Sequence, residues 1–130
     1  MPEPSTTPYE ALGGEEVLST LIDTFYDYVA KHPLLSDIFP IDLTETAYKQ
    51  KLFMTQFLGG PPLYTEEFGH PMLRARHLPF PITKEHAEAW LTCMQQALED
   101  VGVNPVVCDY MMERLTLTAH HMVNQPNNTP

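Results

Sequence analysis

The sequence is poor in basic residues and in cysteine, and it contains no long apolar run. Lysine and arginine number 7 against 17 aspartates and glutamates, so the net charge is −10. This charge argues against binding to nucleic acid or to an anionic membrane. No stretch approaches the roughly 18 apolar residues of a membrane-spanning helix, and the N-terminal stretch MPEPSTTPYE lacks the basic and apolar regions of a signal peptide. We therefore expect a cytoplasmic protein with no nucleic-acid or membrane partner.

Only two cysteines are present, Cys93 and Cys108, and they lack the CxxC spacing of zinc and redox sites. We interpret both as buried, free thiols of a cytoplasmic protein. There are no internal repeats, and 130 residues with 43% hydrophobic content suit a single domain with its own core. We expect this domain to cover residues 8–125, between a disordered arm at 1–7 and a disordered tail at 126–130.

Apolar residues spaced three and four apart predict an all-α chain with four main helices. We expect these at residues 15–32, 43–58, 84–101 and 105–124, with one further helical turn at residues 8–12. Gly13, Gly59 and Gly102 stand where C-terminal caps are expected. Thr83 and Asn104 are typical N-terminal caps. Residues 59–69 contain two prolines and are predicted to form a long loop.

Two polar residues interrupt the apolar face of the helix expected at residues 43–58. Gln50 falls within a row whose other members are Leu43, Ala47, Met54 and Phe57, and Thr46 lies one turn before it. Burying a polar group without a partner costs roughly 1–3 kcal/mol. Gln50 and Thr46 are therefore expected either to satisfy each other or to face a polar ligand in a cavity.

The most specific stretch is residues 69–82, GHPMLRARHLPFPI, in which His77 follows Arg74 and Arg76. Prolines flank this stretch, and the residue before a proline is pushed out of helical geometry, so a short helix is expected to end near His77. An imidazole held there can bind a metal, and the two guanidinium groups can pair with anions beside it. A histidine taken alone is more often hydrogen-bonded or exposed than a ligand.

The pattern H-P-M-L-R-A-R-H-x-P-F resembles the proximal segment of group II truncated haemoglobins, which contains the histidine ligand of the haem iron. Tyr26, preceded by a phenylalanine, and Trp90, thirteen residues after His77, match further positions of that family. The resemblance covers roughly residues 8–125. It implies a truncated globin fold, in which the helix pair 15–32 and 43–58 and the pair 84–101 and 105–124 form a 2-over-2 sandwich around haem. His77 would be the axial iron ligand, and the haem would be non-covalent haem b, because the sequence has no CxxCH motif.

The resemblance also assigns the polar residues of the site. Tyr26 and Trp90 would donate hydrogen bonds to the ligand at the iron, although each could be an ordinary core residue. Thr46 and Gln50 would donate as well, or would orient Tyr26. The pocket wall would be formed by Phe39, Phe53, Phe57, Leu73, Ile82 and Met94.

The anionic propionates of haem would be met by basic and hydroxyl groups. Residues 43–82 carry four bases against three acids, whereas the remainder carries three against fourteen. Solvated surface side chains would give the same count without any ligand. By resemblance, the contacts would come from Lys49, Tyr64 and Arg76, with Arg74 weaker.

The implied function is binding of O2 and other diatomic ligands at pentacoordinate iron, with strong retention of the ligand, as in oxygen transport. The alternative is an enzyme that acts on the bound ligand, by nitric oxide dioxygenation or peroxide reduction, with electrons from an external reductase. A haem-free helical interaction module would require the family match to be accidental. We expect a monomer or a weak homodimer.

Overall fold

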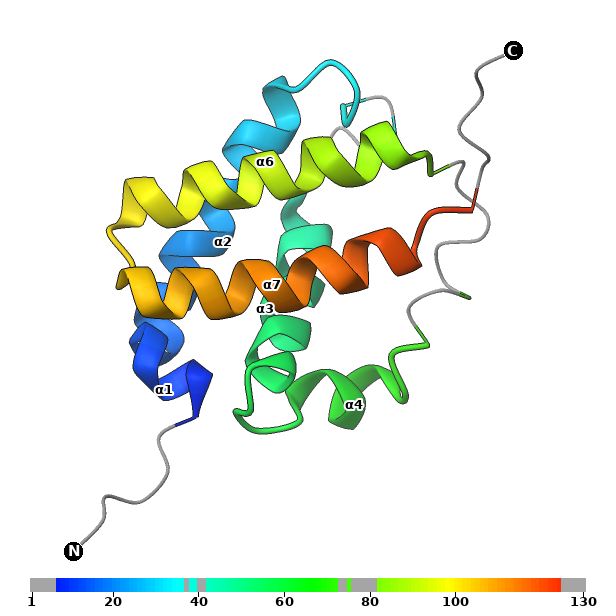
Figure 1. Ribbon diagram of the computed structural model, residues 1–130. Coiled ribbons are helices and arrows are strands. Elements are labelled where there is room, and N and C mark those ends of the chain that lie inside the picture. Colours follow the sequence, from blue (N-terminus) through cyan, green and yellow to red (C-terminus); the bar gives the residue numbers. More distant parts are fainter. Residues whose placement is uncertain (1–6, 37, 40–41, 73–74, 76–81, 125–130) are drawn as a thin grey trace, which may run out of the picture.

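The computed structural model describes residues 7–36, 38–39, 42–72, 75 and 82–124 (Figure 1). Helices account for nearly all the regular structure in these residues, and no strand occurs among them. The helices are α1 (Pro8–Leu12), α2 (Gly14–Lys31), α3 (Thr44–Phe57), α4 (Leu63–Phe68), α6 (Lys84–Val101) and α7 (Pro105–His121). The predicted helices are confirmed to within three residues at each end. Among the described residues, no helix is both long and apolar enough to cross a membrane.

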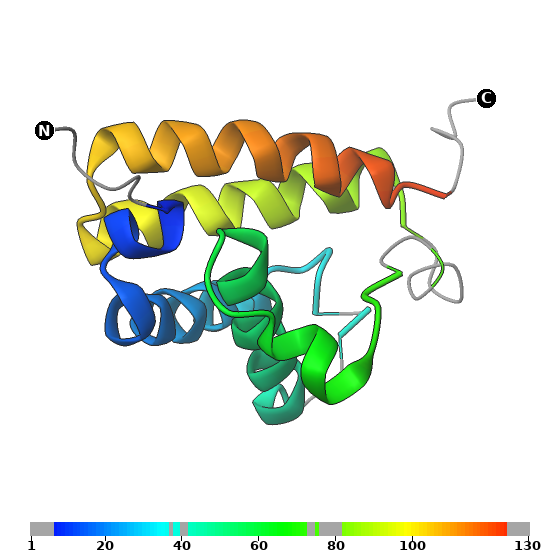
Figure 2. The same ribbon diagram turned by 90° about the horizontal axis from the view of Figure 1, so that it is seen from below.

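The four long helices form two crossed layers. In Figure 1, α6 and α7 lie side by side in front, and α2 and α3 run behind them. Figure 2 shows the two layers from below, with α4 on the same side as α3. α2 packs against both α6 and α3, and α6 packs against α7. This confirms the predicted 2-over-2 arrangement.

The core lies where the two layers cross, because each long helix turns its apolar stripe toward the other layer. Phe25 is fully buried and meets the rings of Tyr26 and Trp90 edge-on, at centroid distances of 4.8 and 4.9 Å. Burying a large apolar side chain contributes roughly 1.5–3 kcal/mol. The other side chains of α2, α6 and α7 that are fully buried include Leu18, Leu21, Ile22, Val29, Met94, Leu98 and Met111.

The helix ends follow the caps that the sequence predicts. The Oγ1 atom of Thr83 accepts from the His86 N–H at 3.2 Å, and His86 Nδ1 accepts from the Thr83 N–H at 3.0 Å. Gly102 ends α6 in the left-handed region, with φ +82°. Asn104 caps α7, with Oδ1 accepting from the Val106 N–H at 2.8 Å. Thr7, which we had placed in the N-terminal arm, caps α1; residues 1–6 and 125–130 lie outside the described residues.

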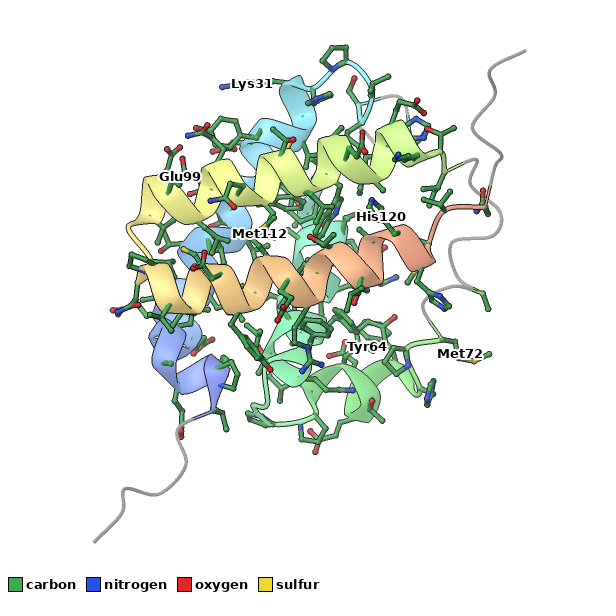
Figure 3. All side chains as sticks on the ribbon, in the orientation of Figure 1. Lys31, Tyr64, Met72, Glu99, Met112 and His120 are labelled. Atoms are coloured by element: carbon green, nitrogen blue, oxygen red, sulfur yellow. The ribbon has the colours of Figure 1, made fainter. Side chains whose placement is uncertain are left out.

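The prediction of a long loop at residues 59–69 is wrong, because this stretch contains α4. Its two prolines precede the first helical residue, where the missing N–H costs nothing. Thr65 on α4 is bound twice to Gln56 on α3, through its N–H at 3.0 Å and its hydroxyl at 2.8 Å. These contacts lie across the turn, so local propensity does not indicate them. Figure 3 shows that Tyr64 lies on the side of α4 that faces α7.

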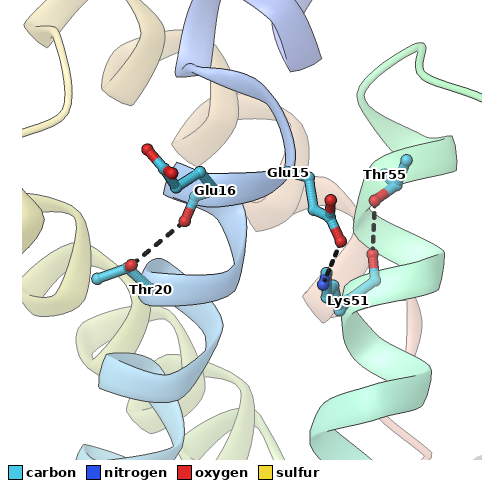
Figure 4. A network of polar contacts seen from close by, with 5 residues as sticks. All are labelled: Glu15, Glu16, Thr20, Lys51 and Thr55. Atoms are coloured by element: carbon cyan, nitrogen blue, oxygen red, sulfur yellow. Dashed lines mark hydrogen bonds and ion pairs between the residues drawn. The ribbon is translucent and has the colours of Figure 1, made fainter.

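Polar contacts lie on the neighbouring parts of α2 and α3, and one of them, an ion pair, joins the two helices (Figure 4). The Lys51 ammonium lies 2.9 Å from the Glu15 carboxylate, while the hydroxyls of Thr20 and Thr55 bond back to carbonyls of their own helices. The Glu15 side chain is 72% exposed, so the ion pair is worth at most about 1 kcal/mol. Apolar packing between the layers therefore outweighs it.

Candidate functional site

A cavity of about 370 Å³ opens between the two layers, within the size range of small-molecule and cofactor sites. Its wall draws on α2, α3, α4, α6 and α7 and on the turn that follows α2. The predicted site residues that line it are Tyr26, Phe39, Thr46, Lys49, Gln50, Phe53, Tyr64, Ile82 and Trp90. Residues predicted on five separate segments thus meet at one place.

The remaining predicted residues fall into two groups. Leu73, Arg74, Arg76 and His77 lie outside the described residues. Phe57 and Met94 were expected in the pocket wall, and neither lines this cavity.

The positions of Phe57 and Met94 have physical explanations. Met94 is fully buried in the core. Phe57 lies one turn beyond Phe53, packs against its ring at 5.5 Å and carries the Arg114 guanidinium over its face at 5.3 Å. Phe57 instead lines a second pocket, whose wall also includes Phe53.

Several lining residues were not predicted as site residues. His86 lies one helical turn before Trp90, so the four-residue spacing on α6 could have indicated it. Thr118, on α7, is a second polar residue of the lining that was not predicted. The others are Leu35, Ile38, Ala87, Leu115, Ala119 and Met122.

Tyr26 is the most buried polar group of the cavity, at 6% exposure. Burial raises the pKa of its hydroxyl above the ordinary value. Like any tyrosine hydroxyl at neutral pH, the group is protonated and can donate a hydrogen bond. In the described part of the chain this hydroxyl has no hydrogen-bond partner, yet no fully buried side-chain nitrogen or oxygen there is left without one. The Tyr26 hydroxyl must therefore reach the open space of the cavity.

Three further polar side chains line the same space. Thr46 and Gln50 both line the cavity, and none of the described hydrogen bonds joins them; that they face a polar ligand stays a prediction. Trp90 can act only as a donor, through its indole N–H, and among the described contacts that N–H has no acceptor. Together with Tyr26, these groups make one side of the cavity rich in hydrogen-bonding capacity that the described residues do not use.

The α3–α4 side of the cavity combines a cation with aromatic rings. The Lys49 ammonium lies 3.8 Å from the Glu45 carboxylate and 5.2 Å from the ring centre of Phe68. Its side chain is 42% exposed, so Lys49 reaches both the solvent and the cavity. Tyr64 is buried at 7% exposure and packs edge-on against Phe53 at 6.1 Å. This side is suited to an anionic substituent near the surface.

The chemistry of the cavity fits a flat apolar group with anionic edges and a polar ligand on one face, which is the description of haem. The aromatic and aliphatic walls suit the ring, Lys49 suits an acidic edge, and the Tyr26 hydroxyl suits a small acceptor. Within the described residues, no three histidine, cysteine or acidic side chains come together as a metal site. A metal carried by a macrocycle does not need such a cluster, because one protein ligand is enough.

Comparison with known proteins gives a consistent result. A family model described as bacterial-like globin matches residues 7–124. Group 2 truncated hemoglobin YjbI of Bacillus subtilis (strain 168) is 68% identical over 118 residues, which are 91% of this chain and 89% of that protein. The crystal structure of the group II truncated hemoglobin from Bacillus anthracis has a TM-score of 0.96 at 64% identity, over 98% of both chains. The X-ray structure of a truncated oxygen-avid haemoglobin from Bacillus subtilis has a TM-score of 0.89 at 66% identity, over 92% of this chain and 100% of the other.

Proposed function

Because the chain belongs to the bacterial-like globin family and is a group II truncated haemoglobin, we propose that it binds haem b in the cavity and holds O2 or another diatomic ligand at a pentacoordinate iron. When bound, haem supplies the iron at which such a ligand binds. The observation that carries the proposal is the Tyr26 hydroxyl, which is neutral, faces the cavity and has no partner among the described residues.

The haem is held by residues of two kinds. His77 is the proposed iron ligand, on the strength of the Arg-x-Arg-His pattern. Lys49, Tyr64 and Arg76 are the proposed partners of the propionates; Lys49 and Tyr64 line the cavity, and Arg76 is assigned from the sequence pattern. The ring plane is enclosed by apolar side chains, for which we propose Phe39, Phe53, Leu73 and Ile82.

Retention of the ligand is the task of the polar side of the cavity. Tyr26 and Trp90 donate, while Gln50 and Thr46 donate as well or orient Tyr26. A hydrogen bond to a charged acceptor is worth roughly 1.5–3 kcal/mol, and about 1.4 kcal/mol corresponds to a factor of ten. Two such donors slow ligand release by on the order of a hundredfold or more. The Bacillus subtilis relative is described as oxygen-avid, which agrees with slow release.

The same donor set supports a second function, redox chemistry on the bound ligand. A protein that releases O2 slowly is a poor carrier, and it is better suited to holding O2 for a reaction such as nitric oxide dioxygenation. Peroxide reduction is the other candidate reaction. For either turnover, an external reductase would supply the electrons.

Three measurements on one preparation test these proposals. Titration of the protein with haem is expected to saturate at one haem per chain, and O2 release from the ferrous form is expected to be slow. Nitric oxide consumption, measured alongside, separates the two functions. Slow O2 release with no nitric oxide or peroxide turnover favours storage, and turnover with an added reductase favours the enzyme. Failure to bind haem would contradict both functions.

A further inference from the structure

Two hydrogen bonds join the end of the described chain to the residue that precedes the cap of α6. The Asn124 N–H donates to the Ile82 carbonyl at 2.9 Å, and the Ile82 N–H donates to Asn124 Oδ1 at 3.0 Å. The two residues are 42 positions apart in sequence. The C-terminal end of α7 and the N-terminal end of α6 lie side by side in both Figure 1 and Figure 2.

Ile82 lies in the cavity wall, directly before the cap of α6. Its side chain is 7% exposed and lines the cavity wall, and Thr83, the residue after it, caps α6. Residues 76–81, directly before Ile82, lie outside the described residues. Met122, two residues before Asn124, lines the cavity as well. The contact therefore ties the residues that follow α7 to the cavity wall.

The two bonds depend differently on the side chain at position 124. The bond from the Asn124 N–H is made by the backbone, so it survives most substitutions. The Ile82 N–H, in contrast, depends on an oxygen at the δ position. A backbone N–H that loses its acceptor away from water bears the desolvation cost of the unmade bond, so the segment around Ile82 would open more often.

We propose that Asn124 is a positioning residue for haem binding. It does not line the cavity; it acts by holding Ile82, whose side chain forms part of the cavity wall that would contact haem. This inference rests on the proposed function, in which His77 binds the haem iron. Asn124 would thus contribute to haem binding without touching the cavity.

The test compares two variants of Asn124 with a matched control. Asn124→Leu has a similar size but removes the acceptor, whereas Asn124→Asp keeps an oxygen for the Ile82 N–H. The control is Asn104→Leu, which removes the same kind of bond, from Oδ1 to a backbone N–H, at the opposite end of α7. Both leucine variants lose one such bond, so a general loss of stability would appear in both.

Three readouts are measured on the haem-loaded protein: hydrogen exchange at the Ile82 amide, the rate of haem transfer to a scavenger globin, and the iron–histidine stretching band. For Asn124→Leu we expect exchange at Ile82 to accelerate at least about tenfold, haem loss to accelerate roughly three- to tenfold, the effect of one hydrogen bond, and the band to shift. Asn124→Asp should resemble the unmodified protein more than the leucine variant. Asn104→Leu should leave all three readouts unchanged.

Each contrary outcome has a distinct meaning. Unchanged exchange at Ile82 in Asn124→Leu would overturn the contact itself. Faster exchange with unchanged haem loss and an unchanged band would overturn the positioning role, and so would equal effects from Asn104→Leu. If the unmodified protein binds no haem, the proposed function fails together with the positioning role, while Ile82 exchange in that protein still reports whether the contact exists.

Discussion

At the scale of single residues, the cavity contains two hydrogen-bond donors, the Tyr26 hydroxyl and the Trp90 indole N–H, that have no acceptor among the described residues. Burial raises the pKa of the Tyr26 hydroxyl. The Tyr26 ring packs edge-on against the rings of Phe25 and Phe39, at centroid distances of 4.8 and 6.1 Å. Trp90 meets the same Phe25 ring at 4.9 Å. One buried phenylalanine thus packs against the rings of both proposed donors.

Replacing either donor by phenylalanine is expected to accelerate O2 release. Tyr26→Phe and Trp90→Phe should each increase the dissociation rate by about tenfold or more, because each removes one hydrogen bond to the ligand. If both donors serve one oxygen atom, the double variant should fall short of the product of the single effects. Stopped-flow measurement of O2 release from the ferrous protein tests this. Fast release from the unmodified protein, unaltered by either change, would favour simple transport.

His77→Gly is expected to abolish haem binding under ordinary conditions, because it removes the proposed protein ligand of the iron. Added imidazole should restore binding by filling the space that the side chain leaves. Visible spectra with and without imidazole provide the measurement, and His70→Gly and His86→Gly serve as matched controls. A normal spectrum for His77→Gly, with loss of haem in one of the controls, would move the ligand to that other histidine.

At the scale of elements, α4 is the part of the fold that brings Tyr64 to the cavity. It is a helix of 6 residues, too short to be stable alone. Its contacts with α3 must therefore hold it in place. Gln56 binds Thr65 twice, Tyr48 donates to Glu67 at 2.5 Å, and Lys49 lies over the ring of Phe68. Without these contacts, α4 would no longer hold Tyr64 in the wall of the proposed haem site.

Gln56→Leu is expected to destabilise the protein by about 1–2 kcal/mol, because it removes both bonds to Thr65. Haem loss should also accelerate several-fold, since α4 would hold Tyr64 less firmly. The control is Gln96→Leu on the exposed side of α6, which removes only a surface bond to Asp100. Chemical denaturation and haem transfer are the measurements. Equal haem loss in the two variants would show that α4 needs no anchor at Gln56.

At the scale of the whole molecule, two layers enclose a cavity without any covalent cross-link among the described residues. Cys93 and Cys108 are both buried and free, as predicted. Burial raises the pKa of each thiol, so both are poorly reactive at neutral pH. Stability therefore depends on packing between the layers. The same packing buries the Tyr26 hydroxyl and opposes its ionisation.

Stability is expected to fall at alkaline pH. The pKa of Tyr26 is raised in the folded protein, so its contribution is fully present below about pH 10, the pKa of an unfolded tyrosine. Above that pH the unfolded chain loses a proton that the folded chain keeps, and stability falls by up to about 1.4 kcal/mol per pH unit. Tyr26→Phe should reduce this slope by one proton. Denaturant titrations between pH 9 and about 11.5 provide the test, and equal slopes for the variant and the unmodified protein would contradict it.

The sequence by itself determined the four long helices and the turn α1, but not α4, because apolar spacing and caps such as Thr83 and Gly102 act within a few residues of the chain. It also indicated the family, through a run of specific residues around His77. The tertiary structure decided which inward-facing residues border the cavity and which fill the core. Met94 and Trp90 lie one turn apart on the same face of α6, yet only Trp90 reaches the open space. Spacing along the helix cannot distinguish the two residues, because it places both side chains between the layers. Only the packing of the opposite layer decides that there is open space beside Trp90 and none beside Met94.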